Sequence, residues 1–105
     1  SNECSNQLGP NGNYIVLDLG SCYDITTLSI TTEDSNSDVD TMRVLAAADS
    51  EMLFSEVHFS DDNNQMSVGV NEKALEFSGR LMKLEFTSNR GHPLYTTVRK
   101  IALFG

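Results

Sequence analysis

A short segment near the C-terminus gathers side chains that could bind a ligand. It holds Asn89, Arg90, His92 and Tyr95 within seven residues. The guanidinium and imidazole groups donate hydrogen bonds, the Asn amide both donates and accepts them, and the Tyr ring offers an apolar face. This set suits a carbohydrate, and it equally suits a peptide or a protein surface. A plain turn would also account for His92.

Catalytic chemistry has little support in the sequence. There is no GxSxG, HExxH or phosphate-cradling motif, and no Ser/His/Asp or Cys/His arrangement with local support. His58 falls in a stretch with strand character, where a surface or half-buried position is the simplest interpretation. Asp61 and Asp62 are adjacent, so in a strand they would face opposite sides and make a poor acid/base pair. We therefore expect that the chain is not an enzyme.

A metal site is also not expected. Alternating oxygen ligands occur at Asp34, Asn36, Asp38 and Asp40, as at the start of a calcium-binding loop. An EF-hand would need Gly in place of Val39 and a bidentate Glu in place of Leu45. The segment therefore reads as a solvated polar loop, and we expect neither a metal nor another cofactor.

Two cysteines, Cys4 and Cys22, stand with 17 residues between them. They are too far apart for a CxxC redox motif, and two thiols alone do not make a structural zinc site. One disulfide or two free thiols remain, and we favour a Cys4–Cys22 disulfide. Such a bond would stabilise the fold by about 3 kcal/mol, because it restricts the unfolded chain. It would also indicate an oxidising compartment.

Composition limits the class of protein and its partners. The 15 acidic and 7 basic residues give a net charge of −8, which opposes binding to DNA, RNA or anionic lipid. No run of 18 apolar residues is present, so no membrane span is expected. With 105 residues, of which 39% are hydrophobic, the chain predicts one globular domain over residues 1–105.

The elements that position these side chains are predicted to be strands. Apolar residues alternate in short blocks, which Asn, Asp, Ser and Gly separate. The blocks are 14–19, 24–32, 41–47, 52–59, 66–70, 73–77, 80–87 and 95–104, with turns at 20–21 and 78–79 and loops at 33–40, 61–65 and 88–93. About eight strands at this spacing predict an all-β fold, a jelly-roll β-sandwich.

Four segments resemble one known family. YIVLDLG at 14–20 and YDITTLSI at 23–30 resemble the "V-D-L-G … Y-x-I-T" signature of the discoidin domains, which include the coagulation factor V/VIII C-type domains and related galactose-binding modules. GRLMKLEFTSN at 79–89 and VRKIALFG at 98–105 resemble two later strands of that family. The order and spacing of the segments agree over most of residues 14–105. The resemblance implies a galactose-binding-like jelly roll.

Departures from the family bear on function. Family members usually carry early strands and a Trp before the first of these segments, so we expect this domain to be abbreviated, circularly rearranged or completed by another chain. The family's structural calcium site uses a Glu of the closing strand, and Lys100 stands there instead. A cation would repel calcium at that position, so we expect the calcium site to be absent.

The resemblance implies that ligands dock on loops at one end of the sandwich, here about 33–40 and 88–95. We therefore expect a non-catalytic, extracellular or cell-surface module that binds carbohydrate through Asn89, Arg90, His92 and Tyr95. The alternative is a protein-interaction module of a larger complex with no glycan ligand, which the absence of Trp and the presence of Lys100 favour. An exposed sheet edge would then pair into a homodimer or with another chain.

Overall fold

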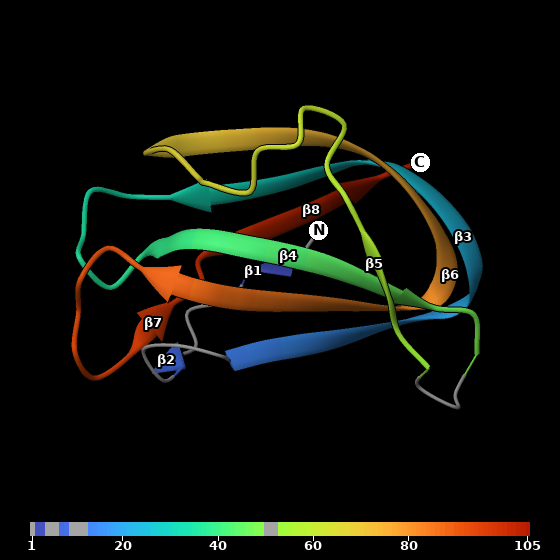
Figure 1. Cartoon of the computed structure of the whole chain (residues 1–105), viewed down its shortest axis with the longest axis horizontal. Helices are drawn as coiled ribbons and strands as arrows, with labels where there is room; N and C mark the ends of the chain where they lie inside the picture. Colours follow the sequence, from blue (N-terminus) through green and yellow to red (C-terminus); the bar gives the residue numbers. More distant parts are fainter. Residues whose placement is uncertain (1, 4–6, 9–12, 50–52) are drawn as a thin grey trace.

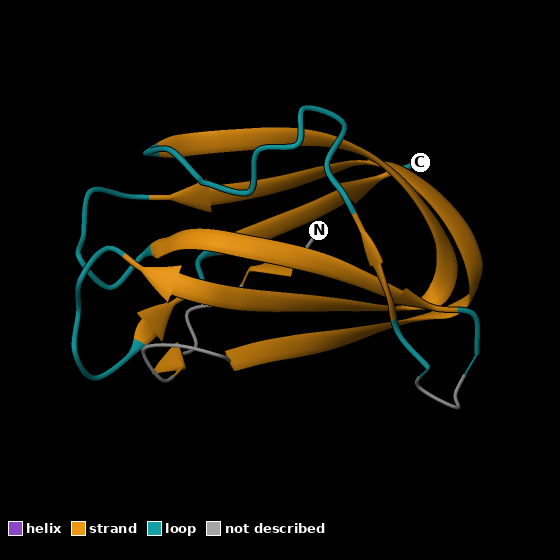
Figure 2. Ribbon diagram, in the orientation of Figure 1, coloured by secondary structure: helices purple, strands orange, loops and turns teal. Residues whose placement is uncertain are grey.

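The computed structural model describes residues 2–3, 7–8, 13–49 and 53–105 of the chain. The elements are β1 (Asn2–Glu3), β2 (Gln7–Leu8), β3 (Asn13–Thr32), β4 (Val39–Ala47), β5 (Ser55–Val57), β6 (Gly69–Asn89), β7 (Thr96–Thr97) and β8 (Lys100–Phe104). Six strands form one sheet in the order β1-β8-β3-β6-β4-β5, and β2 pairs with β7. No helix occurs in these described ranges, and the all-β prediction is confirmed (Figure 2).

Two long, bent strands contribute to both layers of the sandwich. The first part of β3 pairs with the last part of β6, from Asn13↔Phe86 to Asp18↔Leu81. The second part of β3 pairs with the first part of β6, from Tyr23↔Gly79 to Thr32↔Gly69. The sheet continues through β4 and β5 on one side and through β8 and β1 on the other. In Figure 1 both long strands curve round the right-hand end, so the sheet folds over on itself and the predicted β-sandwich is confirmed.

The bends lie where turns were predicted. Gly20 has a φ of +85° within a break in register between Asp18 and Tyr23, and the strand continues beyond it. Gly79 stays in the ladder as the partner of Tyr23, close against the Ala47 backbone. The expected turns at 20–21 and 78–79 were therefore wrong, because β3 and β6 bend through these positions without leaving the sheet.

The core fills the space between the two layers. Apolar residues from the predicted strand blocks are buried in both layers: Leu28, Ile30, Met42, Val44, Leu75, Phe77, Met82, Leu84, Phe86, Val98 and Ile101. Three more from the first block, Ile15, Leu17 and Leu19, are half-buried against this core. Val68 and Val70 are exceptions, since they are 56% and 65% exposed. The register that turns Leu75 and Phe77 inward turns Val70 outward. The expected strand at 66–70 was wrong for 66–68, which lie outside any strand, whereas Gly69 and Val70 begin β6.

Two other predicted strands are shorter than expected. The block 52–59 yields only β5, which pairs with β4 alone, and Phe59 beyond it makes an isolated bridge to Leu75. The block 95–104 divides into β7 and β8, which belong to different sheets. The interruption falls at Val98 and Arg99. There the Arg99 side chain turns toward the loop before β4.

Candidate functional site

Two loops meet at one end of the sandwich, at the left in Figure 1. They are residues 33–38, between β3 and β4, and residues 90–95, between β6 and β7. The Arg90 amide donates to the Asp38 carbonyl at 3.1 Å, and the His92 amide donates to the Asn36 carbonyl at 3.1 Å. The sequence predicted that these two loops lie together, and they do. We call this region the loop end.

Asp38 anchors the loop end from inside. Its side chain is fully buried, and its two oxygens accept from Arg99 Nε at 2.7 Å and Nη2 at 3.2 Å. Arg99 Nη1 lies 2.8 Å from Glu33 Oε2. These charge-assisted bonds, of which the one to Asp38 has the largest effect, raise the pKa of the Arg99 guanidinium.

The position of Asp38 corrects the interpretation of 33–40 as a uniformly solvated loop. Asp38 faces Arg99 in the interior, so the alternating oxygens from Asp34 to Asp40 do not converge on one point. No three His, Cys, Asp or Glu residues among those the structure describes come together as a group that could hold a metal ion.

Asn89 holds the shape of the second loop. Its Nδ2 donates to the carbonyls of His92 and Tyr95, both at 2.9 Å, and its Oδ1 accepts from the Gly91 amide at 2.9 Å. Both ends of the Asn89 amide are therefore committed to the loop backbone. The side chain acts as a brace for the proposed ligand contacts, although the sequence placed it among them.

His92 and Tyr95 form a pair on this braced loop. His92 Nδ1 accepts from the amides of Leu94 at 3.1 Å and Tyr95 at 3.3 Å, which assigns the proton of the neutral ring to Nε2. The two rings lie 3.9 Å apart between centroids and are tilted by 34°. Nε2 has no partner among the described residues. The pair therefore presents an N–H donor beside an aromatic ring.

Arg90 links the two layers at the same end. Its Nη2 donates at 2.9 Å to Oγ1 of Thr32, which ends β3 in the other layer. Its Nε is buried and has no hydrogen-bond partner in the described part of the chain. Five of the seven basic residues lie within ion-pair distance of carboxylates, namely Arg43, Lys73, Arg80, Lys83 and Arg99. Arg90 has no such carboxylate among the residues described, so its guanidinium retains hydrogen-bonding capacity.

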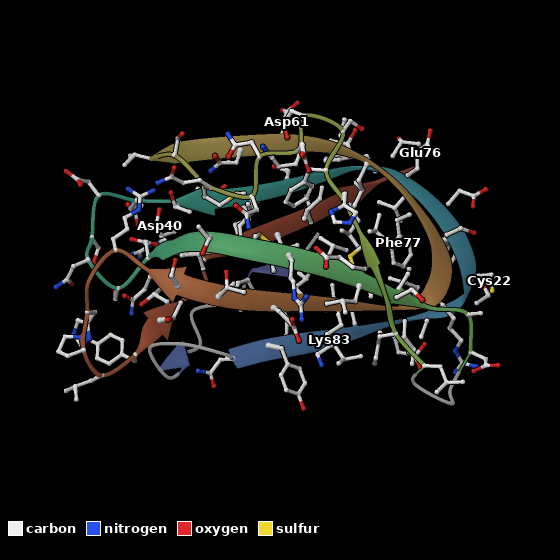
Figure 3. All side chains as sticks on the ribbon, in the orientation of Figure 1. Cys22, Asp40, Asp61, Glu76, Phe77 and Lys83 are labelled. Atoms are coloured by element: carbon white, nitrogen blue, oxygen red, sulfur yellow. The ribbon has the colours of Figure 1, made fainter. Side chains whose placement is uncertain are left out.

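The other candidate residues stay apart from the loop end. His58 lies just beyond β5 and is exposed, with Nδ1 3.6 Å from Glu56 Oε2. Asp61 pairs with Lys73 at 2.7 Å, and Asp62 lies outside that pair. Figure 3 shows Asp61 on the loop at the top of the view.

Cys22 lies at the bend of the sandwich, where Figure 3 labels it. It is an exposed free thiol in the structure, and its Sγ lies 3.4 Å from the Ala48 carbonyl oxygen. Cys4 lies outside the described residues. The Cys4–Cys22 disulfide therefore stays a prediction.

No family model matches the sequence, and no curated protein matches it. Solved structures do match. CBM32-1 from a family 31 glycoside hydrolase of Clostridium perfringens has a TM-score of 0.73 at 12% identity, over 93% of this chain and 72% of that chain. Chitosan-binding module 1 from a chitosanase/glucanase of Paenibacillus sp. IK-5 has a TM-score of 0.69 at 13% identity, over 91% of this chain and 73% of that one.

A third similar structure is the CBM32 of AlyQ in complex with 4,5-unsaturated mannuronic acid. It has a TM-score of 0.69 at 17% identity, over 93% of this chain and 74% of that chain. Identities this low show the fold alone. No helix that could cross a membrane is found in the described ranges. The agreement with these solved structures shows that the chain has their galactose-binding-like β-sandwich fold, and the fold implied by the discoidin-like segments is confirmed.

Proposed function

We propose that this chain is a non-catalytic carbohydrate-binding module and that its ligand docks on the loop end. The observation that carries the proposal is the His92–Tyr95 pair, because a sugar offers a C–H face to an aromatic ring and hydroxyl oxygens to an N–H donor. The fold shared with CBM32 and chitosan-binding modules supports the same function.

Each side chain of the loop end has a separate role in this proposal. Tyr95 supplies the ring, and His92 Nε2 donates to a hydroxyl beside it. Arg90 has its Nε buried and its Nη2 bonded to Thr32, so it offers the N–H groups of Nη1. Leu94, 73% exposed, adds an apolar wall. Asn89 keeps these groups in place, so a ligand finds a largely pre-formed surface.

Calorimetric or NMR titration with a panel of mono- and oligosaccharides tests the proposal. His92→Asn keeps an acceptor where Nδ1 stands but removes the ring and the Nε2 donor. We expect sugar binding at least about tenfold weaker, which corresponds to about 1.4 kcal/mol, with little change in thermal stability. Asp24→Asn, which alters an exposed side chain at the bend, away from the loop end, is the control and should bind as the parent does.

A double variant can contradict the proposed site. If Arg90→Ala/His92→Ala binds sugars as tightly as the parent chain, the loop end is not the ligand site. If no sugar in the panel binds the parent, the alternative of a protein-assembly module takes precedence. Size-exclusion chromatography tests pairing through the sheet edges. One open edge is the first part of β3, where residues 14–18 pair with β6 and have no second strand partner among the described residues. Such an edge can serve as a template for pairing, so the assembly alternative predicts a dimer at high concentration, and a monomer there would contradict edge pairing.

A further inference from the structure

A hollow of about 270 Å³ opens on the flank of the sandwich, beside β4 and β5. The buried Met42 and Phe59 and the half-buried Val57 line its apolar side. The segment 58–64, which follows β5, forms much of its polar rim. This flank hollow shares no lining residue with loops 33–38 and 90–95. It is therefore a second place where a small ligand could be held.

The rim segment is fixed to the sheet beneath it. Phe59 makes a bridge to Leu75, and the Ser60 amide donates to the Ala74 carbonyl at 2.8 Å. Lys73, buried beneath the segment, reaches Asp61 Oδ2 at 2.7 Å. The flank hollow therefore has a pre-formed wall and does not depend on a ligand for its shape.

The other end of the rim segment is held by β4. The Met42 amide donates to the Asn64 carbonyl at 3.1 Å, and the Met66 amide donates to the Asp40 carbonyl. Gln65 Nε2 donates to Asp40 Oδ1 at 3.2 Å. Both ends of the rim are thus tied to strands that also carry the core.

In residues 61–64 of the rim, side chains that bond to the protein alternate with side chains that do not. Asp61 pairs with Lys73, and Asn63 Oδ1 accepts from the Gln65 amide at 3.0 Å. The side chains of Asp62 and Asn64, which line the hollow, have no hydrogen-bond partner among the described residues. A carboxylate and an amide are therefore left free to meet a ligand.

The backbone at Asp62 is strained. Its φ of +56° is the only positive φ of a non-glycine residue in the described ranges. Glycine would adopt this conformation at lower cost. Strained positions of this kind gather at functional sites. The strain places a carboxylate at the rim, where glycine would supply none.

We propose that the flank hollow is a second ligand site, for one neutral sugar residue. Asp62 accepts from neighbouring hydroxyls, Asn64 both donates and accepts, and the C–H face of the sugar packs on the half-buried Val57. Arg43, also on the rim, is paired with Glu56 and Glu85, so the Asp62 charge is left uncompensated. The site therefore rejects sulfated and uronate sugars. The proposal does not depend on sugar binding at the loop end.

NMR titration of the ¹⁵N-labelled chain with galactose, N-acetylglucosamine and glucuronate tests the proposal. We expect the amides of 58–64 to shift in a saturable manner with one of the two neutral sugars, with a Kd of about 1–10 mM, and not with glucuronate. The amides of 90–95 report the loop end separately. Failure at one region is therefore distinguishable from failure at the other.

Asp62→Gly is the decisive variant. Glycine accepts the left-handed backbone, so stability should be kept or raised while the carboxylate is lost. We expect shifts at 58–64 at least about tenfold weaker in affinity. Glu72→Gln, which removes an exposed carboxylate elsewhere, should leave them unchanged. The proposal is overturned if neither neutral sugar shifts 58–64, or if Asp62→Gly binds as the parent does.

Discussion

Asp38 and Arg99 are joined by two parallel hydrogen bonds that close the loop end of the sandwich from inside. Asp38 stands directly before β4, and Arg99 stands between β7 and β8. The carboxylate is fully buried, whereas the guanidinium is one-third exposed and also reaches Glu33. The pair therefore ties loop 33–38 to the segment between β7 and β8, directly after the strand that follows loop 90–95.

This asymmetry predicts unequal costs for the two halves of the pair. Arg99→Met leaves a buried carboxylate without its cation, and we expect a loss of about 3–5 kcal/mol in the free energy of unfolding. Asp38→Ala leaves a guanidinium that retains Glu33 and water, and we expect a loss of about 1–3 kcal/mol. Urea denaturation measures both values. Equal losses in the two variants would contradict the argument.

Asn89 provides a second prediction at the same end. Asn89→Ala removes two bonds to loop carbonyls and one from the Gly91 amide, and we expect a loss of about 1–3 kcal/mol. Asn89→Asp keeps the acceptor for Gly91 but points an oxygen at two carbonyls, so we expect it to be no more stable than the Ala variant. Thermal unfolding compares the two. An Asp variant as stable as the parent would show that Asn89 does not brace the loop.

The sequence predicted most of the core. Strict alternation in 80–87 identified Met82, Leu84 and Phe86 as inward, because side chains of a strand face opposite sides in turn. The sequence could not distinguish a bend from a turn at Gly20 and Gly79, because glycine occurs in both. Whether the strand continues through the glycine depends on its pairing with distant segments of the chain. Two short predicted strands therefore became β3, and three became β6.

The site was predicted less completely than the fold. From the sequence we expected loops 33–40 and 88–95, with His92 and Tyr95 as candidates, at one end of the sandwich, and the structure brings them together there. Their binding of a ligand stays a proposal. The burial of Asp38 was not, because its partner Arg99 lies 61 residues further along the chain. The flank hollow was also missed. The run Asp61-Asp62-Asn63-Asn64 reads as an ordinary turn, and only the structure separates its bonded side chains from its free ones.

The Asp18–Arg80 pair predicts a dependence of stability on pH. Hydrogen bonds from Arg80 and from the Gly20 amide hold the pKa of Asp18 below its ordinary value of 3.8. A carboxyl whose pKa is lower in the folded chain than in the unfolded chain stabilises the fold at any pH above its unfolded-state pKa. This stabilisation is lost as the pH falls through the pKa of the folded state. We expect Asp18→Asn to lose less stability than the parent between about pH 5 and about pH 2. Melting temperatures across this range measure the difference, and parallel curves would contradict it.

Gly79 tests the close approach at the bend. A Cβ at this position would lie 2.7 Å from the Ala47 carbonyl oxygen, which is backbone and cannot move alone. We expect Gly79→Ala to cost about 1–3 kcal/mol, as overpacking does. Ser78→Ala, at the exposed neighbouring position, is the matched control and should change the free energy of unfolding by less than about 0.5 kcal/mol. A Gly79→Ala variant as stable as the control would mean that the bend can open.

Cys22 carries the last prediction, which concerns the compartment. We propose that it is bridged to Cys4 in the protein as it is made by the cell, and that the chain acts outside the cell. Alkylation followed by intact-mass measurement should then label no thiol before reduction and two after it. Cys22→Ser should leave one free thiol and lower stability by about 3 kcal/mol, because the unfolded chain is no longer restricted. Two thiols alkylated without reduction would remove the disulfide and the extracellular proposal with it, since an exposed Cys22 is then an ordinary surface thiol.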